Sequence, residues 1–487
     1  MQTVEFPQGR CLAGVARRDI TPPVGIYHRM WGAATHDRST GVHRPLTTTI
    51  LVMRPDDSLA ASKPVAFVAV DHCLLWNREM NELLDRVSES SGVERSQIIV
   101  FFSHTHAAGL MGHERVDLPG GELIPQYLAD VADAISDGIR EASSQFQPAV
   151  LTYGTGRCNL ATNRDFKDGT LDRFVCGFNP SGKADDTVGV IRLATADNHT
   201  TLATVVNYAC HPTTLAWDNT LISPDYPGAM REVVESATNA PCFFIQGASG
   251  DIGPRHGFVG NTNVADQNGR QLGYAVLSAL EDLPPVDANM KYGGAVISGA
   301  TIGTWDYETS STTQRSRAAA WEEQHSEVSL AYRDDLPRHD ELQREAAEWK
   351  TKEAAATEAG DANTARDARA MIERMTRRIV RVAHLDDAET YPYPIRLWKM
   401  GDAVWVALDG EHYNVLQRNL RNHFSDVPLI IGTLANGSDV WYLPDTASYG
   451  KGLYQEDASI LAQGSLEKLE AALIDQIEKL LQANRSK

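Results

Sequence analysis

Residues 97–109 read QIIVFFSHTHAAG, a short apolar run that ends at a Ser-His-Thr-His cluster. Near-continuous apolar runs of this length are typical of strands buried on both faces. Ligands of open α/β sheets bind where such strands leave the sheet. In extended backbone, residues i and i+2 share a face, so we expect His104 and His106 to point at one centre. This stretch therefore predicts a buried strand that delivers two histidines to a site.

Similar β-rich runs recur on both sides of this stretch, and helical patterns at 77–91 and 125–146 separate several of them. The other expected strands are residues 49–53, 64–70, 149–153, 187–193, 201–209, 242–246, 394–399, 403–408 and 427–433. This alternation predicts an α/β fold, a layered mixed sheet flanked by helices. Apolar residues recur at helical spacing in 465–481, so we expect a closing helix that packs on the body.

A segment near residues 314–384 differs from the rest because it is rich in Ala, Glu, Arg and Lys. Breaks at 334–337 and 360–363 predict three helices. Since strand patterns flank the segment, we interpret it as a charged helical insertion within a single domain that spans residues 1–487. Its mixed charge predicts a solvated insertion, and a lid, an oligomer contact or a partner-binding arm are the alternatives.

Composition and charge exclude several classes of protein. The chain has 487 residues, of which 42% are hydrophobic and 22% charged, as in folded globular proteins. Its net charge of −19 disfavours nucleic acid as a partner. We find no apolar run of about 18 residues that predicts a transmembrane segment. We also find no signal peptide and no Cys-x-x-Cys pair, so a cytoplasmic location is expected. The oligomeric state is not predicted.

Two further expected strands end in candidate metal ligands. His211 directly follows 201–209, and Glu411 follows 403–408 after a short turn. Two histidines and a carboxylate, with one position left to water, form a common zinc site. Spacing alone leaves three other residues in competition for the ligand places: His106, Asp409 and His412.

Several segments, taken in order, resemble the neutral/alkaline non-lysosomal ceramidase family. They are residues 14–23 (GVARRDITPP), the SHTH cluster, Asn163-Arg164, the strand that enters His211, residues 244–252 (FIQGASGDI), residues 408–411 (LDGE) and the closing segment 441–454. The resemblance covers the family's catalytic domain, without its C-terminal immunoglobulin-like domain.

This resemblance implies a zinc-dependent hydrolase of an amide (N-acyl) bond, in which zinc-activated water attacks the carbonyl. The implied cofactor is one Zn²⁺ per chain, and the implied ligands are His104, His211, Glu411 and Tyr442. The implied substrate is a small-molecule or lipid amide.

The resemblance also implies roles for residues around the zinc. His106 becomes a proton-transfer group, because a leaving nitrogen needs a proton near neutral pH. Arg164 and Tyr454 hold the substrate carbonyl as it becomes an oxyanion, and Tyr449 is a substrate-binding residue. Asp251 follows an apolar strand and is a candidate acceptor for a zinc-bound histidine, and Asp71 is a candidate for similar support.

The chain departs from the family pattern near the expected substrate pocket. Family members that hydrolyse ceramide follow the histidine pair with Ser-Gly-Pro-Gly-Gly and carry Asn-Arg-Ser-Pro, whereas this chain has AAGLMG at 107–112 and NRDF at 163–166. The zinc chemistry therefore transfers better than the substrate. Hydrolysis of an ester, a lactone or a non-lipid amide is one alternative, and a catalytically silent metal-binding scaffold is another.

Overall fold

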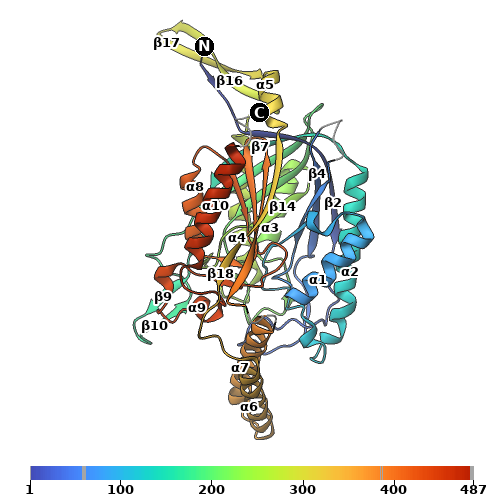
Figure 1. Cartoon of the computed structure of the whole chain (residues 1–487), viewed down its shortest axis with the longest axis vertical. Helices are drawn as coiled ribbons and strands as arrows, with labels where there is room; N and C mark the ends of the chain where they lie inside the picture. The colour runs from blue at the N-terminus through green and yellow to red at the C-terminus, as the bar shows by residue number, and fades with distance from the viewer. Residues whose placement is uncertain (1, 57–61, 384, 386–387, 483–487) are drawn as a thin grey trace.

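An eight-stranded mixed sheet runs through the middle of the protein (Figure 1). The computed structural model describes residues 2–56, 62–383, 385 and 388–482. From edge to edge the strands are β14 (Cys242–Gln246), β12 (Thr201–Tyr208), β11 (Thr187–Thr195), β7 (Gln147–Arg157), β2 (Gln8–Asp19), β4 (Thr47–Arg54), β5 (Val65–Val70) and β6 (Ile98–Phe102). The pairs β12–β14 and β5–β6 are parallel and the others antiparallel, which confirms the predicted mixed sheet.

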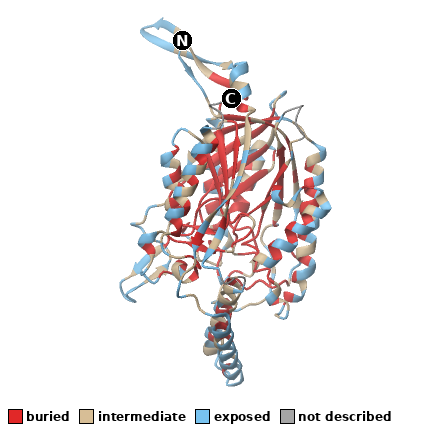
Figure 2. Ribbon diagram, in the orientation of Figure 1, coloured by how far each residue is buried: buried red, intermediate tan, exposed pale blue. Residues whose placement is uncertain are grey.

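The sheet is the second of four layers. One face is covered by α1 (Asn77–Ser91), α2 (Ile124–Ser144), α3 (Tyr226–Thr238) and α4 (Thr262–Glu281). The other face packs against a four-stranded sheet of β18 (Trp321–Ala331), β19 (Thr390–Met400), β20 (Ala403–Leu408) and β22 (Leu429–Gly432). The outer face of that sheet is covered by α8 (Asn414–His423) and α10 (Ser465–Gln482). Figure 2 shows the buried sheets between helices whose outer faces are exposed.

Strand β6 shows why the central strands are apolar at nearly every position. Ile98, Val100 and Phe102 belong to the core beneath α1 and α2. Ile99 and Phe101 face the opposite way, into the core between the two sheets. Because side chains alternate along a strand, a strand covered on both faces needs apolar residues in both registers.

Two elements project from opposite ends of the body (Figure 1). One is the hairpin of β16 (Ala288–Ser298) and β17 (Ala300–Thr309), to which β1 (Thr3–Val4) pairs. The other is the antiparallel pair of α6 (His339–Glu358) and α7 (Ala362–Val382). The pair has a small core of its own, formed by Leu342, Ala346 and Met375.

The helical insertion is confirmed over a narrower range than predicted. Residues 321–331, expected to be helical, form β18, an edge strand that pairs with β19. Short helix α5 (Thr312–Ala318) precedes it, so only α6 and α7 build the projecting pair. An edge strand has few buried positions, and the inward register of β18 includes Glu322, Gln324 and Ser326. Because polar residues occupy both faces of β18, its sequence does not show the alternation of apolar and polar residues that is typical of a strand.

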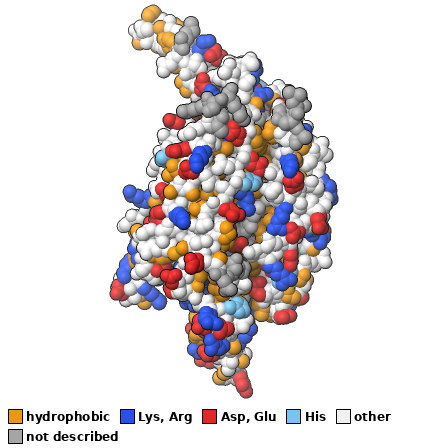
Figure 3. All heavy atoms as spheres, viewed as in Figure 1, with side chains coloured by type: hydrophobic (Ala, Val, Ile, Leu, Met, Phe, Trp, Pro, Cys, Tyr) orange, Lys and Arg blue, Asp and Glu red, His pale blue; other side chains and the backbone are white. Residues whose placement is uncertain are grey.

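Charged side chains of both signs are interspersed on the face shown in Figure 3, and both signs occur on the α6–α7 pair. Among the described helices, none combines the length and the apolar character needed to cross a membrane. The described residues also form short two-stranded pairs: β3 (Gly41–Val42) with β13 (Leu221–Ile222), β8 (Ala161–Asn163) with β15 (Ile252–Pro254), β9 (Asp165–Asp168) with β10 (Arg173–Cys176), and β21 (Glu411–His412) with β23 (Tyr442–Leu443).

Helix α2 approaches β2 closely at Gly14, which gives a test of the layer packing. A Cβ atom at Gly14 would lie 1.8 Å from the carbonyl oxygen of Ala142, so α2 would have to shift. Gly14→Ala is expected to lower the free energy of unfolding by about 1–3 kcal/mol, measured by urea denaturation. Gly169→Ala, at an exposed turn with no atom within 4 Å of the added Cβ, is the control, and its effect should stay within about 0.5 kcal/mol. Equal effects of the two substitutions would contradict the close packing.

Candidate metal centre

His104 leaves the end of β6 in a left-handed backbone conformation, with a φ of 68°. The expectation that His104 and His106 share one face of an extended strand is therefore wrong in its geometry, although their rings do lie 4.9 Å apart. The backbone N–H of His104 donates to the carbonyl of His72 at 2.8 Å, and its Nδ1 lies 2.7 Å from the carbonyl oxygen of Cys73. This bond assigns the proton of the neutral ring to Nδ1 and leaves Nε2 with a free lone pair.

His211 is held in the same way at the end of β12. Its Nδ1 lies 3.0 Å from the carbonyl oxygen of Ser249, so its Nε2 also faces inward with a free lone pair. Asp251 was a candidate acceptor for a zinc-bound histidine, but its carboxylate instead accepts from the backbone of Asn414 at 2.6 Å and from Asn163 at 3.1 Å. Burial raises the pKa of Asp251 to about 7. The acceptor for His211 is thus a backbone oxygen, which leaves no trace in the sequence.

Glu411 and Tyr442 are neighbours in the short parallel pair β21–β23. The turn before Glu411 passes through Gly410 at a φ of 85°, where a Cβ would lie 2.8 Å from the carbonyl oxygen of Trp441. Only glycine combines that conformation with such a close approach. The close turn that positions Glu411 therefore depends on Gly410.

The side chains of His104, His211 and Glu411 converge on one point. The two Nε2 atoms are 2.8 Å apart, and Oε2 of Glu411 lies 3.2 Å from Nε2 of His104 and 3.3 Å from Nε2 of His211. Two lone pairs and a carboxylate oxygen repel at this separation unless a cation lies among them. These edges match the spacing of ligand atoms around a tetrahedral ion with bonds of about 2 Å. The three residues therefore fit a divalent metal ion, and they are one of two such groups among the described residues.

Charge within the cluster is consistent with this fit. Burial opposes protonation of His104, but the Cys73 thiol and the Glu411 carboxylate raise its pKa well above its usual value. Burial lowers the pKa of His211 to about 3, so its ring is neutral. Burial would raise the pKa of Glu411, yet His104 holds it well below its usual value. The cluster thus attracts one cation, either a proton or a metal ion that displaces it.

The structure separates the residues that competed for ligand places. His412 bonds the hydroxyl of Tyr393 through Nε2 at 2.8 Å and belongs to neither group of candidate ligands among the described residues. Asp409 accepts from the backbone of Asp439 at 3.1 Å. His106 does lie beside the cluster, with its ring 5.3 Å from that of His211. A second group, Cys73 with His104 and His106, shares His104 with the first, but the thiol faces Nδ1, which already bonds a carbonyl.

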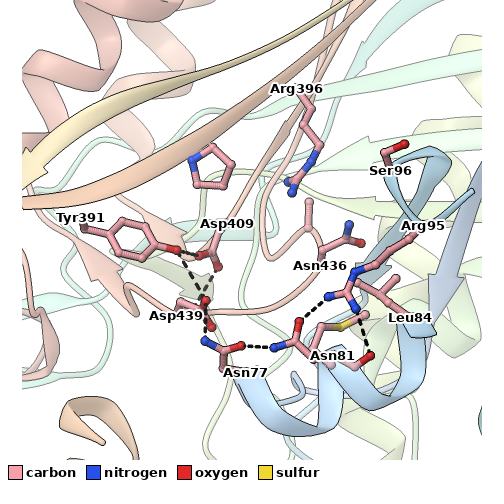
Figure 4. Close-up of a pocket in the computed structure, with 13 residues that line it drawn as sticks. Asn77, Asn81, Leu84, Arg95, Ser96, Tyr391, Arg396, Asp409, Asn436 and Asp439 are labelled. Atoms are coloured by element: carbon pink, nitrogen blue, oxygen red, sulfur yellow. Dashed lines mark hydrogen bonds between the residues drawn. The ribbon is translucent and has the colours of Figure 1, made fainter. Parts of the chain in front are cut away.

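Asp409 belongs to a separate polar cavity of about 460 Å³ beside the turn that carries Glu411 (Figure 4). Tyr391 lies 3.4 Å from its carboxylate, and Asn77 bonds Asp439 at 3.1 Å. Burial and the neighbouring Asp439 raise the pKa of Asp409 well above its usual value. None of the residues that line this cavity belongs to the cluster of His104, His211 and Glu411, so the cavity is separate from the candidate metal centre.

Arg164 joins the cluster to Tyr442. Its guanidinium donates to the Tyr442 hydroxyl at 3.0 Å and to the carbonyl of Gly250 at 2.7 Å, and its Nε is buried without a partner among the described residues. Burial and the carboxylate of Glu411 raise the pKa of Tyr442 well above its usual value, while Arg164 opposes them. The ring of Tyr454 packs against that of Tyr442 at 5.7 Å. These three predicted residues therefore lie together.

Tyr449 is engaged elsewhere. Its hydroxyl donates to the carbonyl of Leu461 at 2.9 Å, within the closing segment of the chain. Burial raises its pKa. A substrate contact by Tyr449 would have to use its ring, and its predicted role stays a prediction.

Residues that sequence reasoning missed form an aromatic wall at His106. The ring of Trp31 lies 5.1 Å from that of His106, and Trp217 and Phe258 pack edge-on against Trp31 at 6.2 and 5.7 Å. Burial lowers the pKa of His106 well below its usual value, and the charges of His104 and His211 lower it further. The wall joins three segments far apart in the sequence, so no local pattern could have revealed it.

Two histidines and a glutamate meet at strand ends of this four-layer fold. The protein is therefore an α/β protein with a candidate metal centre. The model of the family described as neutral/alkaline non-lysosomal ceramidase, N-terminal, matches residues 11–266. The chain belongs to this neutral/alkaline non-lysosomal ceramidase family. Membership places it among hydrolases that act on an amide bond.

Solved structures agree on the fold. The neutral ceramidase from Pseudomonas aeruginosa superposes with a TM-score of 0.62 at 14% identity, covering 97% of this chain and 74% of that one. A structure titled as ceramidase complexed with C2 gives a TM-score of 0.62 at 15% identity, covering 96% of this chain and 74% of that one. Among curated proteins, none matches the chain in a comparison of sequences.

A buried ion pair fixes the loop that orients His104, and this supplies a second prediction. Asp71 binds Arg231 through two bonds of 2.8 and 2.5 Å, next to the carbonyls of His72 and Cys73 that hold His104. Arg231→Gln leaves the Asp71 carboxylate buried without its partner, which should lower the free energy of unfolding by about 3–5 kcal/mol.

The exposed pair Arg86–Asp133, also joined by two bonds, provides the matched control. Arg86→Gln should cost no more than about 1 kcal/mol. Urea denaturation of both variants at neutral pH makes the comparison. A small effect of Arg231→Gln would show that Asp71 does not depend on this pair.

Proposed function

We propose that the protein is a zinc-dependent amidohydrolase that cleaves an N-acyl bond. The observation that carries the proposal is the convergence of two imidazole Nε2 atoms and a carboxylate oxygen within 2.8–3.3 Å of one another. Family membership supports the reaction class, because ceramidases hydrolyse an amide.

His104, His211 and Glu411 would hold the zinc ion, and Tyr442 is the proposed fourth ligand. Two nitrogens and a carboxylate oxygen suit zinc, and a bound zinc ion supplies a Lewis acid together with a water of lowered pKa. Hydrogen bonds from the two Nδ1 atoms to backbone carbonyls orient both rings and increase their basicity. Tyr442 is supported by its pairing with Glu411 in β21–β23.

His106 is the proposed proton carrier. Its Nε2 is buried and has no partner among the described residues, although its ring touches both histidine ligands. We infer that this nitrogen accepts a proton from the attacking water and passes it to the amide nitrogen as the C–N bond breaks. The aromatic wall of Trp31 fixes the ring and excludes bulk water from it.

Arg164 and Tyr454 are the proposed donors to the carbonyl oxygen. Arg164 cannot lose its proton, so it presents a fixed positive charge where the oxyanion develops. Tyr454 is 45% exposed, which leaves its hydroxyl available to a substrate. A substrate contact by Tyr449 is proposed only for its ring face.

The substrate is proposed to be an N-acyl compound, with ceramide as the family's default. Trp31, Trp217 and Phe258 offer an apolar surface beside His106 on which an acyl chain can pack. Residues 107–112 and 163–166 depart from the ceramide-hydrolysing pattern, which supports a wider search among lipid and small-molecule amides.

Metal analysis tests the ligand assignment. Purified protein is expected to hold about one zinc ion per chain, and His211→Ala or Glu411→Gln should lose most of it, because removing a ligand opens the site. His106→Ala is the matched control and should keep its zinc while losing activity. Full zinc in both ligand variants would refute the assignment, and loss of zinc in His106→Ala would reverse the two roles.

A hydrolysis screen tests the reaction. The substrates are a fluorogenic ceramide, short N-acyl amines, N-acyl amino acids and esters, each assayed with zinc-loaded protein and with the Glu411→Gln variant. We expect turnover of at least one amide, lost in the variant. Turnover of esters alone would make the protein an esterase, and no turnover despite bound zinc would favour a metal-binding scaffold.

A further inference from the structure

The inner face of α7 brings two arginines to the edge of the candidate metal centre. Arg377 and Arg381 are one helical turn apart, and residues four apart lie on the same face of a helix. Arg381 is only 5% exposed, although the segment was expected to be a solvated insertion. Figure 1 shows α7 running from the projecting pair up to the body.

Arg381 forms no ion pair with any residue that the structure describes. Its guanidinium carbon lies 3.8 Å from the centroid of the Trp441 ring, and no hydrogen bond or salt bridge joins it to any residue that the structure describes. Its Nε is buried and unbonded within those described ranges. Arg377 donates to the backbone carbonyl of Met30, and its Nε is likewise buried without a partner in the described part of the chain.

The carboxylates near these arginines are already engaged. Glu373, one turn before Arg377, accepts from the Tyr27 hydroxyl at 2.6 Å and from Arg115 at 3.1 Å. Burial would raise the pKa of Glu373, but the charges of Arg115 and Arg377 lower it to about 2.

Asp457 in α9 (Tyr454–Ala458) is bound by two other arginines of α7, Arg374 at 3.0 Å and Arg378. Each carboxylate thus forms its ion pairs or hydrogen bonds with other residues. Glu373 and Asp457 still raise the pKa of Arg377 and Arg381, respectively, but neither forms an ion pair with them in the described part of the chain.

Both arginines face residues of the proposed active site. Trp441, beneath Arg381, precedes Tyr442 in the chain. Burial lowers the pKa of Arg381, while the Tyr454 hydroxyl raises it and Arg377 lowers it. Tyr454 likewise raises the pKa of Arg377 against its burial. The ring of Tyr454 packs against that of Tyr442 and is 45% exposed, so solvent reaches this side of the site.

A buried guanidinium without an anionic partner is costly, because it has lost its hydration without gaining a counter-charge. Such a group is explained when a ligand supplies the missing charge. We propose that Arg381, assisted by Arg377, binds an oxyanion on the substrate, so that the preferred substrate is an amide that carries a carboxylate or a similar acidic group close to the scissile bond. This inference rests on the proposed function, since it names the substrate class of the same site.

The chemistry of arginine restricts the class of ligand that this site can bind. A guanidinium presents several N–H donors in one plane, which matches the two oxygens of a carboxylate, phosphate or sulfate. N-acyl amino acids place a carboxylate a few atoms from the amide and are the simplest compounds with this arrangement. Ceramide and N-acylethanolamines are neutral and would leave both arginines unpaired.

A matched pair of amides tests the inference. N-acylglycine and N-acylethanolamine with the same acyl chain differ mainly in the negative charge. Binding to zinc-loaded protein is measured by calorimetry, and hydrolysis is measured alongside it. Wild-type protein should bind N-acylglycine more tightly. Arg381→Gln should weaken that binding by about 10- to 100-fold, the size of a hydrogen bond to a charged group, and should leave N-acylethanolamine within about twofold.

Two further variants complete the experiment. Arg366→Gln is the control, because Arg366 is exposed on the same helix and pairs only with its neighbour Asp367 among the residues described. It should change neither affinity. Arg377→Gln should weaken the binding of N-acylglycine but not that of N-acylethanolamine, which makes it a second and independent probe of the same anion. Thermal unfolding should show that Arg381→Gln remains folded, since it removes a buried charge that has no partner.

The outcomes separate this inference from the proposed function. Equal binding of the two amides, or an equal effect of Arg381→Gln on both, would overturn the anionic substrate while leaving amide hydrolysis intact. Selective binding of N-acylglycine without hydrolysis of either amide would support the anion site and refute the proposed reaction. An amide that carries a phosphate or sulfate could instead bind more tightly than N-acylglycine, with the same dependence on Arg381. That result would support the anion site and show that its preferred oxyanion is not a carboxylate.

Discussion

The mutual repulsion of three electron-rich atoms is the constraint on which the site depends. Nε2 of His104, Nε2 of His211 and a carboxylate oxygen of Glu411 are held 2.8–3.3 Å apart, closer than they would remain without a cation among them. The protein maintains this arrangement from outside the cluster. Backbone carbonyls of Cys73 and Ser249 fix the two rings. The donor set is therefore preorganised, and the cation that enters it replaces a repulsion with three attractions.

The four-layer fold makes that rigidity possible because its parts approach one another with little space for adjustment. A Cβ at Gly250 would lie 2.6 Å from the carbonyl oxygen of Glu411, so the loop after β14 and the turn after β20 are in backbone contact. The segment after β22 joins both edges of the large sheet, since Thr433 donates to Gln246 of β14 and Asn436 donates to Val100 of β6, each at 2.9 Å. Ligands from distant strands thus share one rigid frame.

The sequence predicts the parts of this frame that have local patterns. Buried strands are visible as apolar runs, and His104, His211 and Glu411 are visible because each follows such a run. Other features have no local signal. The acceptors for the two histidines are backbone oxygens, which any residue would supply. Strand β18 is polar because it lies at an edge, and β2 and the β16–β17 hairpin were not predicted. The charged pattern of α7 indicates a solvated helix, and only its docking on Tyr27 and Trp441 distinguishes the buried Glu373 and Arg381 from their exposed neighbours.

The whole molecule has a negative net charge, whereas several arginines lie near the candidate metal centre. The chain carries a net charge of −19. Near the cluster, however, Arg164 bonds Tyr442 and Arg381 packs on the adjacent Trp441, whereas the one carboxylate of the cluster, Glu411, would be neutralised by a metal ion. A neutral amide needs one positive donor for its developing oxyanion, and Arg164 is sufficient for that purpose. Two additional arginines, buried at a cost to stability, have no role in such a reaction. Binding sites commonly retain groups that destabilise the free protein, because the ligand supplies the missing interaction. The excess positive charge is therefore better explained by the charge of the substrate than by the chemistry of the amide bond.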